Sequence, residues 1–216
     1  MKRWQWIVLV VVVLAVGWYF YRSRLRKVPV QTTPTSEASN SGQASSQPAN
    51  IDWQSIDRQQ DGFKLEMPAG PKQLEVPAYN EKGSSEPVEM LYSDPDGATT
   101  FAVTWEDNPP VARVNDRVPD RTLEAARDGM VTRTHTSLMT QSRSNVAGFP
   151  ALDLTAKNSG GGILDARLIY VHGRLYTLIA TFPSWAARRE QDVIRFYNSF
   201  TPATPAAPQT TRGRTS

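Results

Sequence analysis

An unbroken apolar block near the N-terminus, residues 4–21, constrains this chain more than any other feature of its sequence. The block holds 18 residues and no charged side chain, and its centre contains only Ile, Val, Leu and Ala. A helix rises about 1.5 Å per residue, so the block covers about 27 Å, close to the roughly 30 Å hydrocarbon core of a bilayer. It therefore predicts a single transmembrane helix within an N-terminal anchor, residues 1–27.

Aromatic side chains stand at both ends of the block. Trp4 and Trp6 lie at one end, and Trp18, Tyr19 and Tyr21 lie at the other. Trp and Tyr are enriched at the two membrane–water interfaces, because each combines an apolar ring with a polar group. We expect these five residues to anchor the helix at the two headgroup layers.

A basic cluster follows the block at Arg22, Arg24, Arg26 and Lys27. Basic residues beside a membrane helix are attracted to acidic lipid, so we expect this cluster to contact lipid headgroups. Positive charges on the two sides of the block are nearly equal, with a slight excess that favours a cytoplasmic C-terminal side. The polar spacer and the secretion-like start favour the opposite orientation, and we expect an extracytoplasmic domain.

Two other interpretations of the block remain. Residues 15–17, Ala-Val-Gly, form a small-x-small triplet of the kind that signal peptidase accepts, which is compatible with a cleaved secretory signal. Bulky aromatic residues directly follow that triplet, which argues against cleavage. A buried helix of a soluble core is the other interpretation, but ten consecutive aliphatic residues leave it no polar face.

Two further segments lack the composition of a folded core. Residues 28–50 are rich in Ser, Thr, Pro and Gln and contain no aromatic residue, and residues 204–216 have a similar composition. Such segments bury too little apolar surface to offset the entropy of ordering. We expect a disordered linker and a disordered tail on either side of one domain, residues 51–203.

The net charge of +3 and the pI near 9.3 suggest a basic protein, but the charges are unevenly placed. Residues 51–200 hold 16 Lys and Arg against 20 Asp and Glu, a net charge of −4. Most of the basic excess belongs to the anchor. Nucleic-acid binding needs a basic surface that neutralises phosphates, so we expect no nucleic-acid partner.

Alternation of apolar and polar residues predicts strands through much of this domain. The alternating stretches are residues 63–67, 88–92, 101–105, 152–156, 166–170 and 176–182. Turn-forming residues such as those at 158–162 and 172–173 separate the later stretches and predict successive hairpins. Helical spacing of apolar residues predicts two helices, over 121–134 and 185–200, the second capped by Ser184. Together these patterns predict an α+β fold.

Four segments resemble bacterial domains with the PsbP-like fold, a family named for an extrinsic photosystem II protein. They are GFKLEMPAGPK at 62–72, GFPALDL at 148–154, RLIYVHGRLYTL at 167–178 and RFYNSF at 195–200. The resemblance implies an antiparallel β-sheet sandwiched by helices. It also implies relatives that act mostly as non-catalytic binding or assembly modules, many of them tethered or exported, and it supplies no catalytic motif.

Residues with catalytic or ligand-binding chemistry are sparse. The chain has no cysteine, and its two histidines, His135 and His172, stand outside any metal-binding or catalytic spacing. The glycines at 160–162 lack the flanking residues of a phosphate-binding loop. The acidic pairs Asp94 with Asp96 and Glu106 with Asp107 are typical of solvated surface loops. We therefore expect no catalytic residue, metal or cofactor.

Two functions fit this sequence. The first is a non-catalytic, membrane-tethered interaction or assembly module of the cell envelope, which binds membrane lipid through its helix and a protein partner through its domain. The alternative is a ligand-binding or hydrolytic domain with a pocket between sheet and helix, lined by Trp53, Trp105 or Trp185. A pocket that collects Trp, Arg and a carboxylate would favour the alternative.

Overall fold

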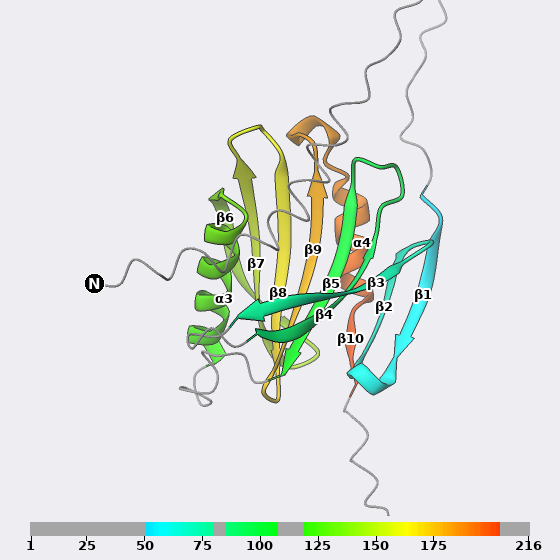
Figure 1. Ribbon diagram of the computed structural model, residues 1–216, viewed down its shortest axis with the longest axis vertical. Coiled ribbons are helices and arrows are strands. Elements are labelled where there is room, and N and C mark those ends of the chain that lie inside the picture. The colour runs from blue at the N-terminus through cyan, green and yellow to red at the C-terminus, as the bar shows by residue number, and fades with distance from the viewer. Residues whose placement is uncertain (1–50, 80–84, 108–118, 204–216) are drawn as a thin grey trace, which may run out of the picture.

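The computed structural model describes residues 51–79, 85–107 and 119–203. These residues form two antiparallel sheets and two α-helices (Figure 1). The strand order is β1-β2-β10 in the three-stranded sheet and β3-β4-β5-β9-β8-β7-β6 in the seven-stranded sheet. This arrangement confirms the predicted α+β class.

The strands and helices have the following bounds. The strands are β1 (Trp53–Arg58), β2 (Phe63–Pro68), β3 (Lys72–Tyr79), β4 (Ser85–Ser93), β5 (Thr100–Asp107), β6 (Thr136–Val146), β7 (Phe149–Asn158), β8 (Ile163–Val171), β9 (Arg174–Phe182) and β10 (Thr201–Pro202). The α-helices are α3 (Pro119–Arg133) and α4 (Glu190–Ser199), and the 3-10 turns are η1 (Gln59–Asp61) and η2 (Trp185–Ala187).

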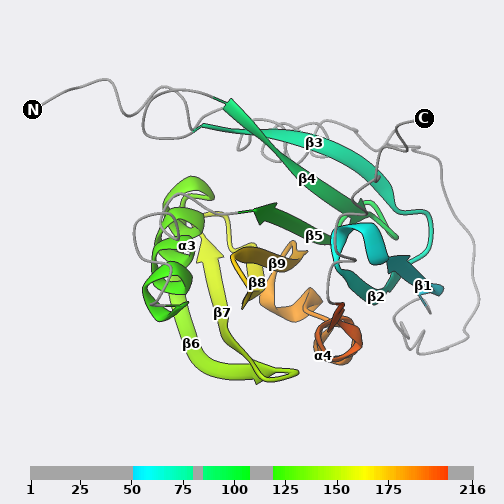
Figure 2. The ribbon, with the colours of Figure 1, turned by 90° about the horizontal axis from the view of Figure 1, so that it is seen from below.

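Strand β8 contributes side chains to two hydrophobic cores, one on each face of the large sheet. Leu164 and Leu168 join the cluster that contains Leu123 of α3, whereas Ile169 joins the cluster that contains Phe196 of α4. Successive strand residues point to opposite faces, so the seven-stranded sheet has a core on each face. The two helices lie on opposite faces of this sheet (Figure 2). The expected sandwich of helices about a sheet is therefore present.

The three-stranded sheet and α4 together cover one face of the large sheet. Phe63 and Met67 of β2 are fully buried, and Phe101 of β5 contacts Phe196 of α4 edge-to-face with ring centroids 5.4 Å apart. Ser199 of α4 accepts a hydrogen bond of 2.8 Å from the Glu66 backbone amide, which ties the helix to β2. Burying each large side chain here contributes about 1.5–3 kcal/mol.

The prediction of one helix over 185–200 is wrong at its start. Ser184 does act as a cap, but its hydroxyl accepts from the Ala187 amide at 3.3 Å and caps the short turn η2. Arg188 then takes an extended conformation, and its guanidinium donates to the buried carboxylate of Asp165 at 2.7 Å. This ion pair accompanies the break, and α4 begins only at Glu190.

Four strands, β1, β3, β6 and the two-residue β10, are not among the strands that alternation predicts. Strand β6 is the clearest case, because it lies at the edge of the large sheet and seven consecutive residues, 137–143, are exposed. A strand with two solvated faces has no apolar side to alternate. Its pairing with β7 also shifts between Leu138 and Thr140, a β-bulge of the kind that interrupts exposed edges.

Candidate functional site

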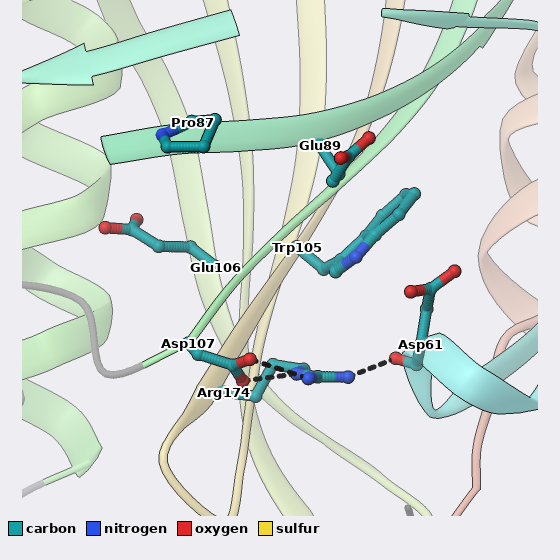
Figure 3. Close-up of a pocket in the computed structure, with 7 residues that line it drawn as sticks. All are labelled: Asp61, Pro87, Glu89, Trp105, Glu106, Asp107 and Arg174. Carbon is teal, nitrogen blue, oxygen red and sulfur yellow. Dashed lines mark hydrogen bonds and ion pairs between the residues drawn. The ribbon is translucent and has the colours of Figure 1, made fainter. Parts of the chain in front are cut away.

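A pocket of about 300 Å³ lies at one end of the seven-stranded sheet (Figure 3). Strands β4 and β9 begin there, β5 ends there, and η1 of the smaller sheet lies beside them. Four carboxylates and one guanidinium line it, so its lining is acidic. The lining residues are Asp61, Pro87, Glu89, Trp105, Glu106, Asp107 and Arg174.

Strand alternation sets the direction of the three lining residues of β5. Trp105 and Asp107 share the face that carries η1, and Glu106 points to the other face (Figure 3). Glu106 interacts electrostatically with Arg133 at the end of α3. The adjacent acids Glu106 and Asp107 therefore do not act as a facing pair.

The hairpin between β8 and β9 places Arg174. Val171 pairs with Arg174, which leaves a two-residue loop of His172 and Gly173 with φ values of 47° and 89°. Two consecutive positive φ values are typical of a type I′ turn, whose twist matches that of the flanking strands. Arg174 is thus the first residue of β9, directly across from Asp107 of β5.

Arg174 connects the two sheets at the floor of the pocket. Its Nε and Nη2 donate to the two carboxylate oxygens of Asp107 at 2.5 and 2.7 Å, and its Nη1 donates to the Asp61 carbonyl at 2.5 Å. The bidentate pair with Asp107 raises the pKa of Arg174 and lowers the pKa of Asp107. Both groups are therefore held in their charged forms at neutral pH.

Tyr176 forms hydrogen bonds with the same backbone segment, at Asp61 and Gly62. Its hydroxyl lies 2.9 Å from the Asp61 carbonyl and 3.0 Å from the Gly62 carbonyl, so it can donate to either acceptor. Burial raises the pKa of Tyr176, which keeps the hydroxyl protonated and able to donate. The short turn η1 is thereby fixed against β9.

Trp105 forms an aromatic wall that is 6% exposed. Its ring lies 5.1 Å from the ring of Phe63, and the Arg58 guanidinium lies 5.4 Å from its centroid. Arg58 also pairs with the Asp61 carboxylate at 2.6 Å. The Asp61 carboxylate is thus neutralised by Arg58, whose guanidinium lies over the Trp105 ring.

Glu89 differs from Asp61 and Asp107 in its partner. Its carboxylate accepts from the neutral side-chain amide of Gln73 at 2.8 Å, and within the described residues no cation lies at ion-pair distance. Glu75, also acidic, is its cross-strand partner on β3. Like charges on paired strands repel, so a cation arriving beside Glu89 would be stabilised.

Such a site can hold a positively charged group by charge-assisted hydrogen bonds. An ionised carboxylate has lone pairs for about four donors, so Asp107 and Glu89 can each accept more bonds than they make here. A guanidinium or ammonium group is the matching guest. A pocket of about 300 Å³ is at the small end of ligand sites and has room for one side chain.

The three tryptophans considered from the sequence do not meet in one site. Trp105 lines the pocket, whereas Trp53 packs edge-to-face on Phe101 with ring centroids 5.5 Å apart. Trp185 is 56% exposed and has the Arg188 guanidinium 5.3 Å from its ring. The pocket also has no lining residue from α3 or α4. The expectation of a pocket between sheet and helix is therefore wrong for this pocket.

The histidines and the glycine run have structural surroundings. His172, in the β8–β9 turn, packs edge-to-face on Phe149 with ring centroids 4.9 Å apart, and His135 lies just after α3 with a φ of 50°. In the turn at 160–162, the amide of Gly162 donates to the Asn158 side chain at 2.8 Å. These contacts are those of turns.

Asp96 has a structural role in the β4–β5 turn. Its carboxylate accepts from the amides of Ala98 and Thr99 and from the Thr99 hydroxyl, at 2.9, 2.6 and 2.9 Å. Among the described residues, no group of three or more His, Asp or Glu side chains is arranged to hold a metal ion.

The predicted anchor and headgroup-contact residues lie outside the described residues. They are Trp4, Trp6, Trp18, Tyr19, Tyr21, Arg22, Arg24, Arg26 and Lys27. In the part of the chain that the structure describes, neither α-helix has the length and apolar character that a bilayer crossing requires.

Sequence reasoning missed Asp61, Glu89 and Arg174. A signal was present in the distribution of charge along the domain. Residues 51–107 hold 4 basic and 12 acidic residues, whereas residues 108–200 hold 12 basic and 8 acidic residues. Strands β3, β4 and β5 are neighbours in the large sheet and contain five acidic residues and one basic residue, so part of the acidic half of the domain gathers on this side of the sheet. The net charge of the whole domain, −4, does not reveal this difference between its two halves.

Comparison with known proteins gives similarity at the level of solved structures. No protein-family model and no curated protein matches the sequence. A similar solved structure is cyanobacterial PsbP (CyanoP) from Synechocystis sp. PCC 6803, with a TM-score of 0.47, 14% identity, and coverage of 79% of this chain and 99% of that chain. A protein of unknown function from Pseudomonas aeruginosa has a TM-score of 0.39 and 14% identity over 65% of this chain and 92% of that chain. The first belongs to the family that the sequence resembles, and at these values the resemblance stays a prediction.

Proposed function

We propose that this protein is a non-catalytic, membrane-tethered binding module of the cell envelope, and that its acidic pocket receives a basic side chain of a protein partner. The N-terminal helix would hold the domain at the membrane. The expected 23-residue linker would have an end-to-end distance of roughly 25–30 Å as a flexible chain, so the pocket would sample partners close to the bilayer.

The proposal rests on Glu89, whose carboxylate has a neutral hydrogen-bond partner where the other paired acids of the pocket have a cation. Asp107 is neutralised by Arg174 and Asp61 by Arg58, whereas Glu89 accepts only from a neutral amide among the described residues. Its charge therefore remains available to a cation from outside. Electrostatic complementarity of this kind fixes partner choice and speeds association more than it adds raw affinity.

The geometry favours a long basic side chain. Arg carries a planar fork of donors on an apolar stem, and Lys carries a compact ammonium group on a similar stem. The charged end would lie among the carboxylates of Glu89 and Asp107. The stem would lie along Trp105, which is the apolar wall of the pocket.

The hydrolytic alternative receives less support from the same residues. A general acid or base works best when its pKa lies near the operating pH. The pair with Arg174 moves the pKa of Asp107 in the opposite direction, to below its ordinary value. Binding of a small cationic ligand remains the second candidate, because Trp105, Arg174 and several carboxylates do meet in the pocket.

Peptide binding tests the proposal. The full chain in zwitterionic detergent is titrated with acetyl-Arg-Gly-Arg-amide, and amide chemical shifts of β4, β5 and β9 are followed by NMR. We expect saturable shifts around the pocket that weaken severalfold as salt rises from about 0.02 M to about 0.3 M, because screening shortens the reach of charge. The Glu89→Gln variant should lose most of this binding.

The matched control is Glu124→Gln, which makes the same change on α3, where Glu124 pairs with Arg143 of the far edge strand β6. It should bind like the unaltered chain. Equal loss in both variants, or no shift at the pocket, would contradict the proposal. Crosslinking of the full chain in its native membrane, with and without Glu89→Gln, then identifies the partner and separates a protein from a small cationic ligand.

A further inference from the structure

The described part of the chain ends beside the pocket. Strand β10 pairs with Phe63 and Lys64 of β2, and the Ala203 amide donates to the Gly62 carbonyl at 2.8 Å. Gly62 directly follows Asp61, a lining residue, and its carbonyl also lies 3.0 Å from the Tyr176 hydroxyl. Ala203, the last described residue, therefore lies beside the Asp61 corner of the acidic pocket.

The segment that starts there is basic. Residues 204–216 contain Arg212 and Arg214 and no Asp or Glu. The pocket lining has four carboxylates against one guanidinium, and Glu89 is the carboxylate with a neutral partner. The segment and the pocket thus carry opposite charges and are joined covalently at short range.

The segment is long enough to return to the pocket. Arg212 comes nine positions after Ala203 in the sequence, and an extended chain over nine positions spans at most about 30 Å. A random coil of the same length has a root-mean-square span of about 17 Å. Short linkers of this kind give effective concentrations on the order of millimolar, so even a weak contact would be populated.

We propose that Arg212 and Arg214 occupy the acidic pocket of their own chain and compete there with the basic side chain of the partner. This inference rests on the proposed function of the pocket and adds its regulation. One guanidinium would donate to Glu89 and Asp107, and the other would lie beside Glu75, the cross-strand partner of Glu89 on β3. A partner must displace the segment before it binds.

The expected effect of the segment on peptide affinity follows from its effective concentration at the pocket. For an effective concentration on the order of 5 mM and an intrinsic dissociation constant on the order of 1 mM, the segment weakens binding of an external peptide about sixfold. The variant that carries Arg212→Ala and Arg214→Ala should therefore bind acetyl-Arg-Gly-Arg-amide about sixfold more tightly than the unaltered chain.

A spin label tests occupancy directly. The chain contains no cysteine, so Ser216→Cys provides a single site for a nitroxide. In the full chain in zwitterionic detergent, we expect paramagnetic broadening of the Asp107 and Arg174 amides. The same labelled chain with Arg212→Ala and Arg214→Ala is the matched control, because it keeps the tether and removes only the guanidinium groups.

The outcomes separate the two proposals. Stronger broadening at the pocket with the arginines than without them supports the inference, and equal broadening overturns it. Broadening that disappears when acidic lipid is added to the micelles, with no change in peptide affinity between the two variants, assigns the arginines to the lipid and also overturns it. If the peptide binds both variants equally, the binding function of the pocket stands and its regulation by the segment falls. If the peptide binds neither variant, the binding function falls, and the broadening alone decides the position of the segment.

Discussion

Gly62→Ala is the substitution for which the structure gives the sharpest expectation. Gly62 has a φ of 77°, and a methyl group built at its Cα would lie 2.7 Å from the Tyr176 hydroxyl. That hydroxyl is the group that fastens η1 to β9 through the carbonyls of Asp61 and Gly62. The substitution therefore strains the backbone and displaces the tyrosine from its acceptors.

Gly70 provides a reference for the backbone contribution. Its φ of 76° nearly equals that of Gly62, and a methyl group there would meet nothing within 4 Å. A left-handed conformation costs an Ala about 1–2 kcal/mol, and this contribution applies equally at the two positions. Loss of the buried tyrosine bonds adds about 1–3 kcal/mol at Gly62 alone. For a domain of this size, that difference lowers the melting temperature by about 2–12 °C.

Thermal unfolding of the full chain in detergent, followed by circular dichroism, measures the difference between Gly62→Ala and Gly70→Ala. Repeating it in a Tyr176→Phe background removes the atom that clashes, so the excess cost at Gly62 should shrink. If the two glycine variants melt together, or if the excess is unchanged in the Tyr176→Phe background, the packing argument for this corner of the pocket is refuted.

Four further predictions concern charge, a buried hydroxyl, the membrane and the independent folding of the domain. The pair with Arg174 lowers the pKa of Asp107 in the folded state, so the pair stabilises the fold above the unfolded pKa of about 3.9, and this contribution is lost as pH falls through the folded pKa. Asp107→Asn should therefore flatten the fall in stability below about pH 4. An unchanged slope in acid unfolding would count against this prediction. The Tyr197 hydroxyl is buried without a hydrogen-bond partner among the described residues, so Tyr197→Phe should leave stability unchanged or raise it by up to about 1 kcal/mol in urea titrations, and a loss of more than about 1 kcal/mol would reveal a missing partner. The intact chain should stay in the membrane pellet through carbonate washing, whereas release of a fragment that starts near Trp18 would show cleavage. Residues 51–203 alone should unfold cooperatively, and the absence of a thermal transition would contradict their independence.

Local pattern was enough to predict most of the secondary structure. Strands such as β5 and β9 have one face in a core, so their side chains alternate in the sequence itself. Strand β6 shows where this reasoning stops, because both of its faces are solvated and its residues need not alternate. The second helix shows another limit, because it begins only after the break at Arg188, whose ion-pair partner Asp165 lies 23 residues away.

The candidate site depended on contacts that local pattern does not contain. Arg174 and Asp61 are 113 residues apart, and Arg174 and Asp107 are 67 residues apart. Pairing of β5 with β9, and packing of the small sheet against the large one, bring them together. Composition did show an acidic first half of the domain, but it did not show which acids would find a cation within the fold.

The sequence by itself determined the α+β class and predicted a membrane-anchored chain. The reason is that the periodicity of strands and helices, and the length of a membrane-spanning block, are each contained in a continuous stretch of sequence. The tertiary structure alone decided that Asp61 and Asp107 are neutralised while Glu89 faces the pocket beside a neutral amide. The physical reason is that the effect of a charge depends on its neighbours in space. In this domain those neighbours come from strands that lie far apart along the chain.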